Sequence, residues 1–380
     1  MAINPSFRLV IAGGGTGGHV LPALAVVEEL RGRGLPLDLL WIGSHGDVEG
    51  PAAVRAGIPF RAVQTGKLRR YVAAETILDA ARLPVGTVQA WRILRAFHPD
   101  AIFSTGGFVS VPTVVAGARL APVLTHEQTA ILGLATRINL RFADVLALSF
   151  EPTASHVTGF AGRVVVTGNP VRSSLRHGDP ARGLARFGFT ADLPLLYVTG
   201  GARGASPLNR RVAAILPDLL ATCQVLHQTG PATANDDLKM LEDLAAGWPP
   251  DLRRRYRAVE FVRDELADVY AAAALVLGRA GAGTVAELAY LGKPGLLIPL
   301  PGSGGGEQDA NARTLADARA AVVLAQDEAT PERLRTDLER LLGDPGRLRS
   351  MGERAASLAR PDAAARLAEE LLKLAGRRSD

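Results

Sequence analysis

A short apolar run that ends in paired glycines and leads into a helical pattern occurs twice in this chain. Residues 9–12 precede Gly13 and Gly14, and residues 195–199 precede Gly200 and Gly201. Apolar runs without polar alternation are typical of strands that a parallel sheet buries on both faces. Further runs of this kind alternate with helical segments, which indicates βαβ units. The sequence therefore predicts an α/β fold of two Rossmann-like, doubly wound domains.

The chain length agrees with two domains, because a single core rarely grows past about 250–300 residues and this chain has 380. The turn-forming segments at residues 168–170 and 178–180 mark the boundary region. We predict an N-terminal domain over residues 1–168 and a C-terminal domain over residues 169–350. Residues 351–380 are helical by composition, and the sequence leaves open whether they pack back on the N-terminal domain.

Composition excludes several classes of protein. The 41 glycines are clustered and not periodic, which excludes collagen. Cys223 is the single cysteine, which excludes a disulfide framework and a metal site with several thiolates. No basic and apolar leader opens the chain, and no apolar run reaches the ~18–20 residues that span a bilayer. We therefore expect a cytoplasmic protein that is soluble or attached to a membrane surface.

Glycine-rich loops follow several of the predicted strands. Gly13, Gly15 and Gly18 match the pattern G-x-G-x-x-G, in which backbone N–H groups and a helix N-terminus bind anions. A dinucleotide site would also need an acid at the end of the second strand, and residues 41–44 hold none, which disfavours that class. Because ligands bind beyond the carboxyl ends of parallel strands, we expect the loops to converge on one cleft between the domains. The other loops of this kind are residues 105–107, 199–204 and 280–284.

Two side chains beside these loops are candidates for binding or catalysis. Glu287 is expected in the first turn of a helix, where a carboxylate can accept hydrogen bonds from both hydroxyls of a ribose; alternatively it only complements the helix dipole. His19 opens the first helix and is a candidate base or hydrogen-bond donor; alternatively it only caps that helix. The chain has no Asp-x-Asp motif and no His, Asp or Glu cluster at metal spacing. We predict no metal ion and no other cofactor.

Taken together, the motifs resemble the MurG family of peptidoglycan glycosyltransferases. They occur in the family's order and span residues 9–312, which is most of the chain. The matching segments are G-G-T-G-G-H at 14–19 with P-A at 22–23, T-G-G-F-V-S at 105–110, H-E-Q at 126–128, G-N-P-V-R at 168–172, G-G at 200–201 with G-A at 204–205, L-N at 208–209, R-A-G-A-G-T-V-A-E at 279–287, G-K-P at 292–294, and E-Q at 307–308 with N-A at 311–312.

The resemblance implies the GT-B fold and an inverting, metal-independent N-acetylglucosaminyltransferase. Such an enzyme moves GlcNAc from UDP-GlcNAc to the C4 hydroxyl of undecaprenyl-diphospho-MurNAc-pentapeptide (lipid I) and so forms lipid II for peptidoglycan. Helix dipoles and backbone donors would stabilise the leaving diphosphate. The resemblance also implies a peripheral location at the cytoplasmic face of the cell membrane, a part in cell shape and division, contacts with other cell-wall synthesis proteins, and no nucleic-acid partner.

The resemblance also implies roles for particular residues. His19 is the candidate catalytic base or orients the acceptor. In the donor site Glu287 would bind the ribose, and the backbone of Val262 would contact the uracil. The acceptor diphosphate is assigned to Gly14, Gly15, Gly106 and Gly107. The donor is assigned to Thr16, Gly17, Gly18, Thr129, Arg172, Ala202, Arg203, Val262, Ala282, Gly283, Thr284, Val285, Ala286, Glu287, Glu307 and Gln308.

The sequence departs from the family pattern in three places. Thr129 stands where the family usually has Asn, which puts one contact with a sugar hydroxyl in doubt. Ala202 and Arg203 replace Ser and Gln, so a hydroxyl donor to phosphate is lost and the charge of Arg203 is its candidate replacement. Glu307 occupies a position that is often His or Gln. These departures bear on single contacts and not on the class of reaction.

Residues 65–97 carry much of the net positive charge of +5. Basic residues there alternate with apolar ones, a pattern typical of surfaces that bind anionic lipid. We predict a membrane-docking surface that includes Arg69, Arg70, Leu83 and Trp91. The alternative is that the apolar residues belong to the core.

Two other functions stay open at this point. One is another GT-B enzyme that uses a UDP-sugar, such as a UDP-GlcNAc 2-epimerase or a glycolipid glycosyltransferase. The other is a non-catalytic module that binds nucleotides or polyanions through the basic segment, which would predict salt-sensitive binding to nucleic acid.

Overall fold

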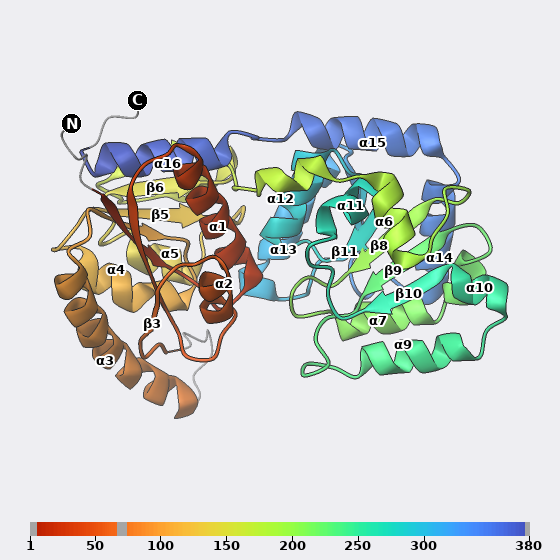
Figure 1. Cartoon of the computed structure of the whole chain (residues 1–380), viewed down its shortest axis with the longest axis horizontal. Coiled ribbons are helices and arrows are strands. Elements are labelled where there is room, and N and C mark those ends of the chain that lie inside the picture. The colour runs from red at the N-terminus through yellow and green to blue at the C-terminus, as the bar shows by residue number, and fades with distance from the viewer. Residues whose placement is uncertain (1–5, 67–73, 377–380) are drawn as a thin grey trace. The chain divides into compact units, whose positions relative to one another are not determined.

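The computed structural model describes residues 6–66 and 74–376, and it describes side chains in the helix that starts at residue 74 only from residue 83 onward (Figure 1). The chain divides into two compact units. The N-terminal unit comprises the chain up to Arg172 together with the segment from Arg360 onward, and the C-terminal unit is Ser173–Ala359. Each unit contains one parallel sheet with helices on both faces, which confirms the predicted α/β fold class.

The sheet of the N-terminal unit has the strand order β3-β2-β1-β4-β5-β6-β7, and all its pairings are parallel. The order changes direction between β1 and β4, so the loops that follow these two strands lie next to each other at the carboxyl edge. The strands are β1 (Phe7–Ala12), β2 (Leu37–Gly43), β3 (Phe60–Ala62), β4 (Ala101–Ser104), β5 (Val123–Glu127), β6 (Val145–Leu148) and β7 (Arg163–Val166).

Both faces of this sheet are covered by helices. Leu9 and Ile11 of β1 belong to one core, which they share with α1 and α16, while Val10 and Ala12 belong to another, shared with α3 and α4. This arrangement explains why the strands are apolar without alternation. The helices are α1 (Gly17–Gly32), α2 (Glu49–Arg55), α3 (Ala74–Phe97), α4 (Val111–Gly117), α5 (Leu134–Asn139) and α16 (Ala363–Leu374), with short 3-10 helices η1 (Phe108–Ser110) and η2 (Glu151–His156).

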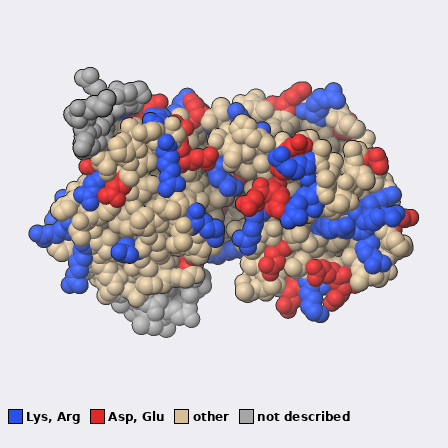
Figure 2. Space-filling view, viewed as in Figure 1, with Lys and Arg blue, Asp and Glu red and all other residues tan. Residues whose placement is uncertain are grey.

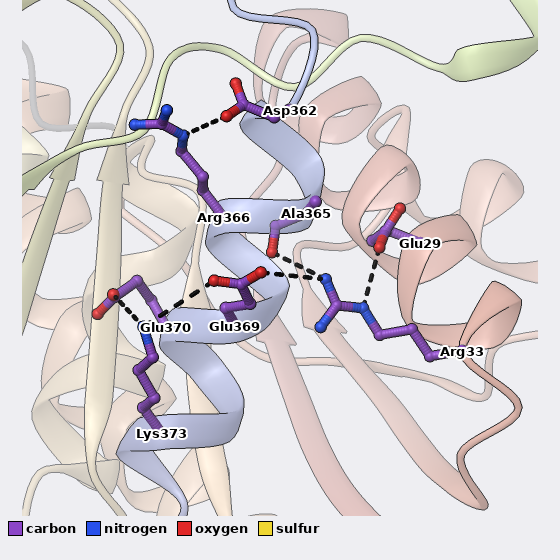
Figure 3. Close-up of polar contacts among 8 residues, drawn as sticks. All are labelled: Glu29, Arg33, Asp362, Ala365, Arg366, Glu369, Glu370 and Lys373. Atoms are coloured by element: carbon purple, nitrogen blue, oxygen red, sulfur yellow. Dashed lines mark hydrogen bonds and ion pairs between the residues drawn. The ribbon is translucent and has the colours of Figure 1, made fainter. Parts of the chain in front are cut away.

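Helix α16, near the end of the chain, packs on α1 in the N-terminal unit. Its residues Leu367 and Leu371 are fully buried in the core that also holds Leu30 of α1. Arg33, the C-cap residue of α1, donates to the backbone oxygen of Ala365 at 3.1 Å (Figure 3). A hydrogen bond of this kind contributes only about 0.5–1.5 kcal/mol, so the apolar contacts chiefly hold the helix in place.

The sheet of the C-terminal unit has the strand order β10-β9-β8-β11-β12-β13 and is also parallel. Its order changes direction between β8 and β11, which repeats the arrangement of the N-terminal unit. The strands are β8 (Leu195–Thr199), β9 (Gln224–Gln228), β10 (Tyr256–Val259), β11 (Ala273–Gly278), β12 (Gly295–Leu297) and β13 (Ala321–Val323).

The largest core of the C-terminal unit lies between the sheet and the helices α7, α8, α9, α14 and α15. Helix α15 crosses position 350, where the sequence analysis divides the chain, and packs on α12 with Gly352 close to Gly292. The helices are α6 (Pro180–Phe187), α7 (Ser206–Ala213), α8 (Leu216–Leu219), α9 (Asp237–Ala246), α10 (Pro250–Arg254), α11 (Leu266–Ala272), α12 (Ala282–Leu291), α13 (Glu307–Asp317), α14 (Pro331–Leu342) and α15 (Pro345–Ser357), with η3 (Ser173–His177) and η4 (Ser303–Gly305).

Candidate functional site

The residues singled out in the sequence form two groups, one at the carboxyl edge of each sheet. In the N-terminal unit the first glycine loop follows β1 and leads into α1. Two buried side chains hold its backbone: Trp41 Nε1 donates to Gly13 O at 2.9 Å, and Gly15 N donates to Glu49 Oε2 at 2.9 Å. A Cβ at Gly14 would lie 2.2 Å from the Glu49 carboxyl carbon. Glycine is therefore required at position 14 for the carboxylate to reach the loop.

Glu49 is fully buried and is itself well satisfied by hydrogen bonds. Its other oxygen, Oε1, accepts from the backbone N–H of Ser44 at 2.8 Å and from the Ser44 hydroxyl at 2.6 Å. Sequence reasoning missed Glu49, although it is the first acid of α2, which follows the second strand. The amide of Gly15 is thus engaged inside the protein. The amides of Gly17 and Gly18, which open α1, have no acceptor within the helix.

His19 lies in the first turn of α1 and contacts the two neighbouring loops. Its Nδ1 is 2.8 Å from the carbonyl oxygen of Thr105 and 3.0 Å from Gln128 Oε1. Both partners are acceptors, so Nδ1 carries the hydrogen and the lone pair of the neutral ring is on Nε2. Gly107, at φ 73°, lies against the ring, and a Cβ there would be 3.0 Å from His19 Cδ2. The ring is therefore fixed with Nε2 as its proton acceptor.

Gln128 connects His19 to the buried His126. The amide nitrogen of Gln128 donates to Thr105 O at 2.8 Å and lies 3.1 Å from His126 Nδ1, which leaves its oxygen for His19. His126 Nε2 lies 3.0 Å from Gly168 O. Complete burial lowers the pKa of His126 to about 4, the backbone bond to Gly168 opposes this, and nearby His19 lowers it further. His126 is thus neutral at pH 7, and the sequence motif H-E-Q is a hydrogen-bond network behind His19.

Thr129 lies in a turn that the buried Glu127 organises. The hydroxyl oxygen of Thr129 is 2.7 Å from Glu127 Oε1 and 2.6 Å from the carbonyl oxygen of Ile131. Glu127 also accepts from the amide of Gly133 at 2.9 Å. The Thr129 hydroxyl therefore has partners within the chain, and the predicted donor contact at this position remains a prediction.

In the C-terminal unit the second group begins at the N-terminus of α12. Gly281 is the N-cap residue, and glycine has no side chain that could cap the first turn, which carries the positive end of the helix dipole. A Cβ built on Gly281 or Gly283 would meet no atom within 4 Å, so open space adjoins this helix end. Among the predicted donor residues of α12, Thr284 and Ala286 are half-buried, whereas the Val285 side chain points into the core.

Glu287 lies in the second turn of α12, which corrects the expectation of a first-turn residue. The helix begins at Ala282, so Ala282 and Gly283 of the glycine loop already belong to it. The hydroxyl of Tyr270 donates to Glu287 Oε2 at 2.6 Å. Burial raises the pKa of Tyr270 well above 10, and Glu287 raises it further, so the phenol stays a donor. Tyr270 thus orients the carboxylate of Glu287, and sequence reasoning missed it because it lies on another helix, α11.

Val262, the predicted uracil contact, follows β10 and is buried. Its backbone N–H donates to Gln228 Oε1 at 2.9 Å, and the Tyr197 hydroxyl donates to the same oxygen at 3.1 Å. Tyr197 in turn packs edge-on against Tyr270, with ring centroids 5.7 Å apart. The amide of Val262 is therefore engaged, and its carbonyl oxygen is the group that a base could use.

The other predicted donor residues lie on loops at the same edge or at the end of the N-terminal unit. Gln308 folds back so that its Oε1 accepts from Leu300 N at 2.9 Å, and Glu307 packs over Gly304. Ala202 and Arg203 are exposed in the loop after β8, and Arg172 is half-buried at the end of the N-terminal unit. Among the described residues, no group of three or more His, Cys, Asp or Glu side chains is placed to hold a metal ion.

The chain belongs to glycosyltransferase family 28. Residues 9–147 match the N-terminal domain of this family, and residues 195–367 match its C-terminal domain. It is 34% identical over 376 residues to UDP-N-acetylglucosamine--N-acetylmuramyl-(pentapeptide) pyrophosphoryl-undecaprenol N-acetylglucosamine transferase of Exiguobacterium sibiricum, covering 98% of this chain and 100% of that protein. It is 36% identical over 370 residues to the enzyme of the same name from Listeria monocytogenes, covering 97% and 99%.

Solved structures show the same relationship. The crystal structure of MurG from Acinetobacter baumannii has a TM-score of 0.73 at 29% identity, covering 97% of this chain and 100% of that chain. The UDP-GlcNAc 2-epimerase of Neisseria meningitidis, bound to UDP-GlcNAc, has a TM-score of 0.65 at 13% identity, covering 97% and 100%. The second likeness shows a common fold alone.

The two buried histidines predict a loss of stability in mild acid. Burial lowers the pKa of His126 to about 4 and that of His227, in the C-terminal unit, to about 3. Below pH 6.5 these histidines are protonated in the unfolded chain but remain neutral in the folded chain. The free energy of unfolding therefore falls by about 2 kcal/mol for each histidine as the pH falls from 7 to 5. Urea unfolding of wild type, His126→Gln and His227→Gln at both pH values measures this. A loss in either variant as large as in wild type would contradict that assignment.

Proposed function

We propose that this protein transfers GlcNAc from UDP-GlcNAc to lipid I, with inversion, and so forms lipid II for peptidoglycan. The proposal rests mainly on the relatives that bear the name of this transferase. They are 34–36% identical to this chain over nearly its whole length. The alternative, a UDP-GlcNAc 2-epimerase, is supported only by a common fold at 13% identity. The hydrogen-bonded His19 adds a chemical argument, because a displacement at the sugar needs a base for the attacking hydroxyl.

In the proposed reaction the C4 hydroxyl of the acceptor attacks the anomeric carbon of GlcNAc. The proton of this hydroxyl passes to His19 Nε2. That nitrogen is the proton acceptor because Nδ1 already donates within the protein. The new C–O bond forms as the bond from the anomeric carbon to the diphosphate breaks, and the electron pair leaves with UDP. Gln128 acts as a positioning residue because its oxygen fixes the hydrogen on Nδ1.

We assign the donor to the C-terminal unit. Glu287, oriented by Tyr270, would accept hydrogen bonds from the ribose hydroxyls, and the N-terminus of α12 would face the diphosphate. The open space at Gly281 and Gly283 supports a ligand close to the backbone there. The carbonyl of Val262 would contact the uracil, and the exposed Arg203 would add a positive charge near the phosphates. No metal is needed in this scheme, because helix dipole and backbone donors face the leaving group.

We assign the acceptor diphosphate to the N-terminal unit. The amides of Gly17 and Gly18 at the start of α1 are the hydrogen-bond donors best placed to bind this diphosphate, because the amide of Gly15 already donates to Glu49. This assignment moves the main backbone N–H donors three residues along, from Gly14 and Gly15 to Gly17 and Gly18, which the family resemblance assigns to UDP-GlcNAc. Gly106 and Gly107 would serve chiefly by allowing the loop after β4 to approach His19.

We further propose that the second half of α3 docks on the cytoplasmic face of the cell membrane. Val88 and Trp91 are 51% and 40% exposed, and they line an apolar pocket of about 430 Å³ with Val115 and Phe142. The exposed Arg119 lines the same pocket, and the exposed Arg95 lies over the Trp91 ring at 5.1 Å. Arg92 of the same helix is also exposed. Leu83 is half-buried on the same helix, while Arg69 and Arg70 lie outside the described residues. None of the described helices is long and apolar enough to cross a membrane.

Surface charge does not favour the nucleic-acid alternative. On the face in Figure 2 basic side chains gather at the right-hand end of the C-terminal unit, and acidic side chains lie beside them. Several of them pair, as Arg333 does with Asp337. A polyanion groove would instead gather unpaired basic residues. The proposal also includes contacts with other cell-wall synthesis proteins and, through the supply of lipid II, effects on cell shape and division.

The activity itself is tested by transfer of radiolabelled GlcNAc from UDP-GlcNAc to a lipid I analogue. Wild type should form labelled lipid II, and His19→Ala should lower kcat about 10²–10⁴-fold because the base is lost. The exposed His156→Ala is the matched control and should keep full activity. Absence of transfer by wild type would reject the function, and near-normal kcat in His19→Ala would reject only the base.

The ribose assignment is tested by calorimetric titration with UDP. Glu287→Ala should weaken binding about 10–100-fold, since a hydrogen bond to a charged group is worth about 1.5–3 kcal/mol. Tyr270→Phe should weaken it less, and should have no effect once Glu287 is already Ala. Tyr256→Phe removes a buried hydroxyl elsewhere in the same unit and is the control. Additive effects of the first two changes would show that Tyr270 does not act through Glu287.

The membrane assignment is tested by sedimentation with phosphatidylglycerol vesicles. Trp91→Ala and Val88→Ser should each lower the bound fraction several-fold, because exposed apolar side chains enter the headgroup boundary. Leu244→Ala, which removes an equally exposed apolar residue of the C-terminal unit, should leave binding unchanged. Equal binding by all three variants and wild type would remove the membrane role from this helix.

A further inference from the structure

Arg279 is a buried cation whose guanidinium has no acidic partner. It is 6% exposed and lies between β11 and the N-cap of α12. Its Nη1 donates to the carbonyl oxygens of Ile298 at 3.0 Å and Pro299 at 3.1 Å, and its Nη2 donates to Gln326 Oε1 at 2.6 Å. All three acceptors are neutral, and no carboxylate of the described chain forms an ion pair with it.

This arrangement differs from that of other buried charges in the same unit. Asp268 pairs with Arg182, and Asp337 pairs with Arg333 and Arg340. For Arg279, burial lowers the pKa first, and the neighbouring charge that lowers it further is another cation, Arg211. An arginine stays protonated in proteins, so the charge remains. A buried charge without a counter-charge costs free energy.

The position of Arg279 suggests what balances this charge. The guanidinium lies at the carboxyl edge of the sheet. It donates hydrogen bonds there to Ile298, which follows β12, and to Gln326, which lies in the segment after β13. The N-terminus of α12 follows Arg279 directly, and α13 begins at the far end of the loop that starts at Pro299. Helix N-termini carry positive partial charge. The first turn of α13 carries Glu307 and Asp309, whereas the first turn of α12 has no acidic residue. The positive field at this edge therefore comes from Arg279 and the N-terminus of α12.

We propose that Arg279 is a binding determinant for the diphosphate of the nucleotide donor, and that the ligand supplies the negative charge that the protein omits. This inference rests on the proposed function, because it takes a nucleoside diphosphate as the ligand of the C-terminal unit. Arg279 acts through its field and by holding the loop after β12, since its hydrogen bonds go to the protein. Its contribution should therefore depend on the charge of the ligand and not on its base or ribose.

Calorimetric binding of UDP and of uridine separates charge from shape. Arg279→Met should weaken UDP binding about tenfold or more, as expected for charges that interact at short range in a partly buried site, and should leave uridine affinity within about twofold. Arg279→Lys keeps the charge, so the ratio of UDP affinity to uridine affinity should stay close to that of wild type. Gln326→Leu removes one hydrogen bond of Arg279, keeps its charge, and should leave that ratio unchanged.

Two outcomes overturn the inference, and each is distinct from a failure of the proposed function. Equal losses for UDP and uridine in Arg279→Met would show that Arg279 only supports the fold of the loop. A ratio that falls as far in Gln326→Leu as in Arg279→Met would show that the hydrogen bonds matter and the charge does not. By contrast, wild type that binds UDP but transfers nothing to a lipid I analogue would reject the function and leave the assignment of Arg279 intact.

Discussion

Both sheets are parallel throughout, and a parallel strand requires the chain to cross back to the starting edge before the next strand begins. Every loop that leaves a carboxyl end therefore lies at one edge of its sheet, and the change of direction beside β1 and β8 brings two such loops together. His19 meets the loop after β4 for this reason, and Glu287 follows the loop after β11. Most strand residues are apolar and buried, and the polar ones that serve the site, His126 and Glu127, stand at the carboxyl end of β5.

The two units hold their loops with buried charges of opposite sign. Glu49 carries a negative charge behind the first glycine loop, and N–H and O–H donors satisfy it. Arg279 carries a positive charge behind the start of α12, and carbonyl oxygens satisfy it. In both cases the dipoles are in place before any ligand binds, which is how an electrostatic site avoids reorganisation during the reaction. The same rigidity fixes which ring nitrogen of His19 is available.

The sequence was sufficient to predict the two α/β domains, because strand periodicity and glycine turns are local signals. It also located His19 and Glu287, since both adjoin glycine loops. It did not reveal the partners that orient them: Gln128 lies 109 residues from His19, and Tyr270 lies on a different helix from Glu287. Such contacts depend on the packed fold. For the same reason the engaged amides of Gly15 and Val262 could not be anticipated from their positions in the motifs.

The place of α16 has a consequence for synthesis. The helix covers apolar residues of α1, yet the ribosome makes it after the whole C-terminal unit. At about 5–20 residues per second, the 187 residues of Ser173–Ala359 take on the order of 10–40 seconds to emerge. During that interval the C-terminal unit can complete its own core while the N-terminal unit still lacks one helix. The unit that begins first is therefore finished last, and nascent chains expose the apolar face of α1 until α16 arrives.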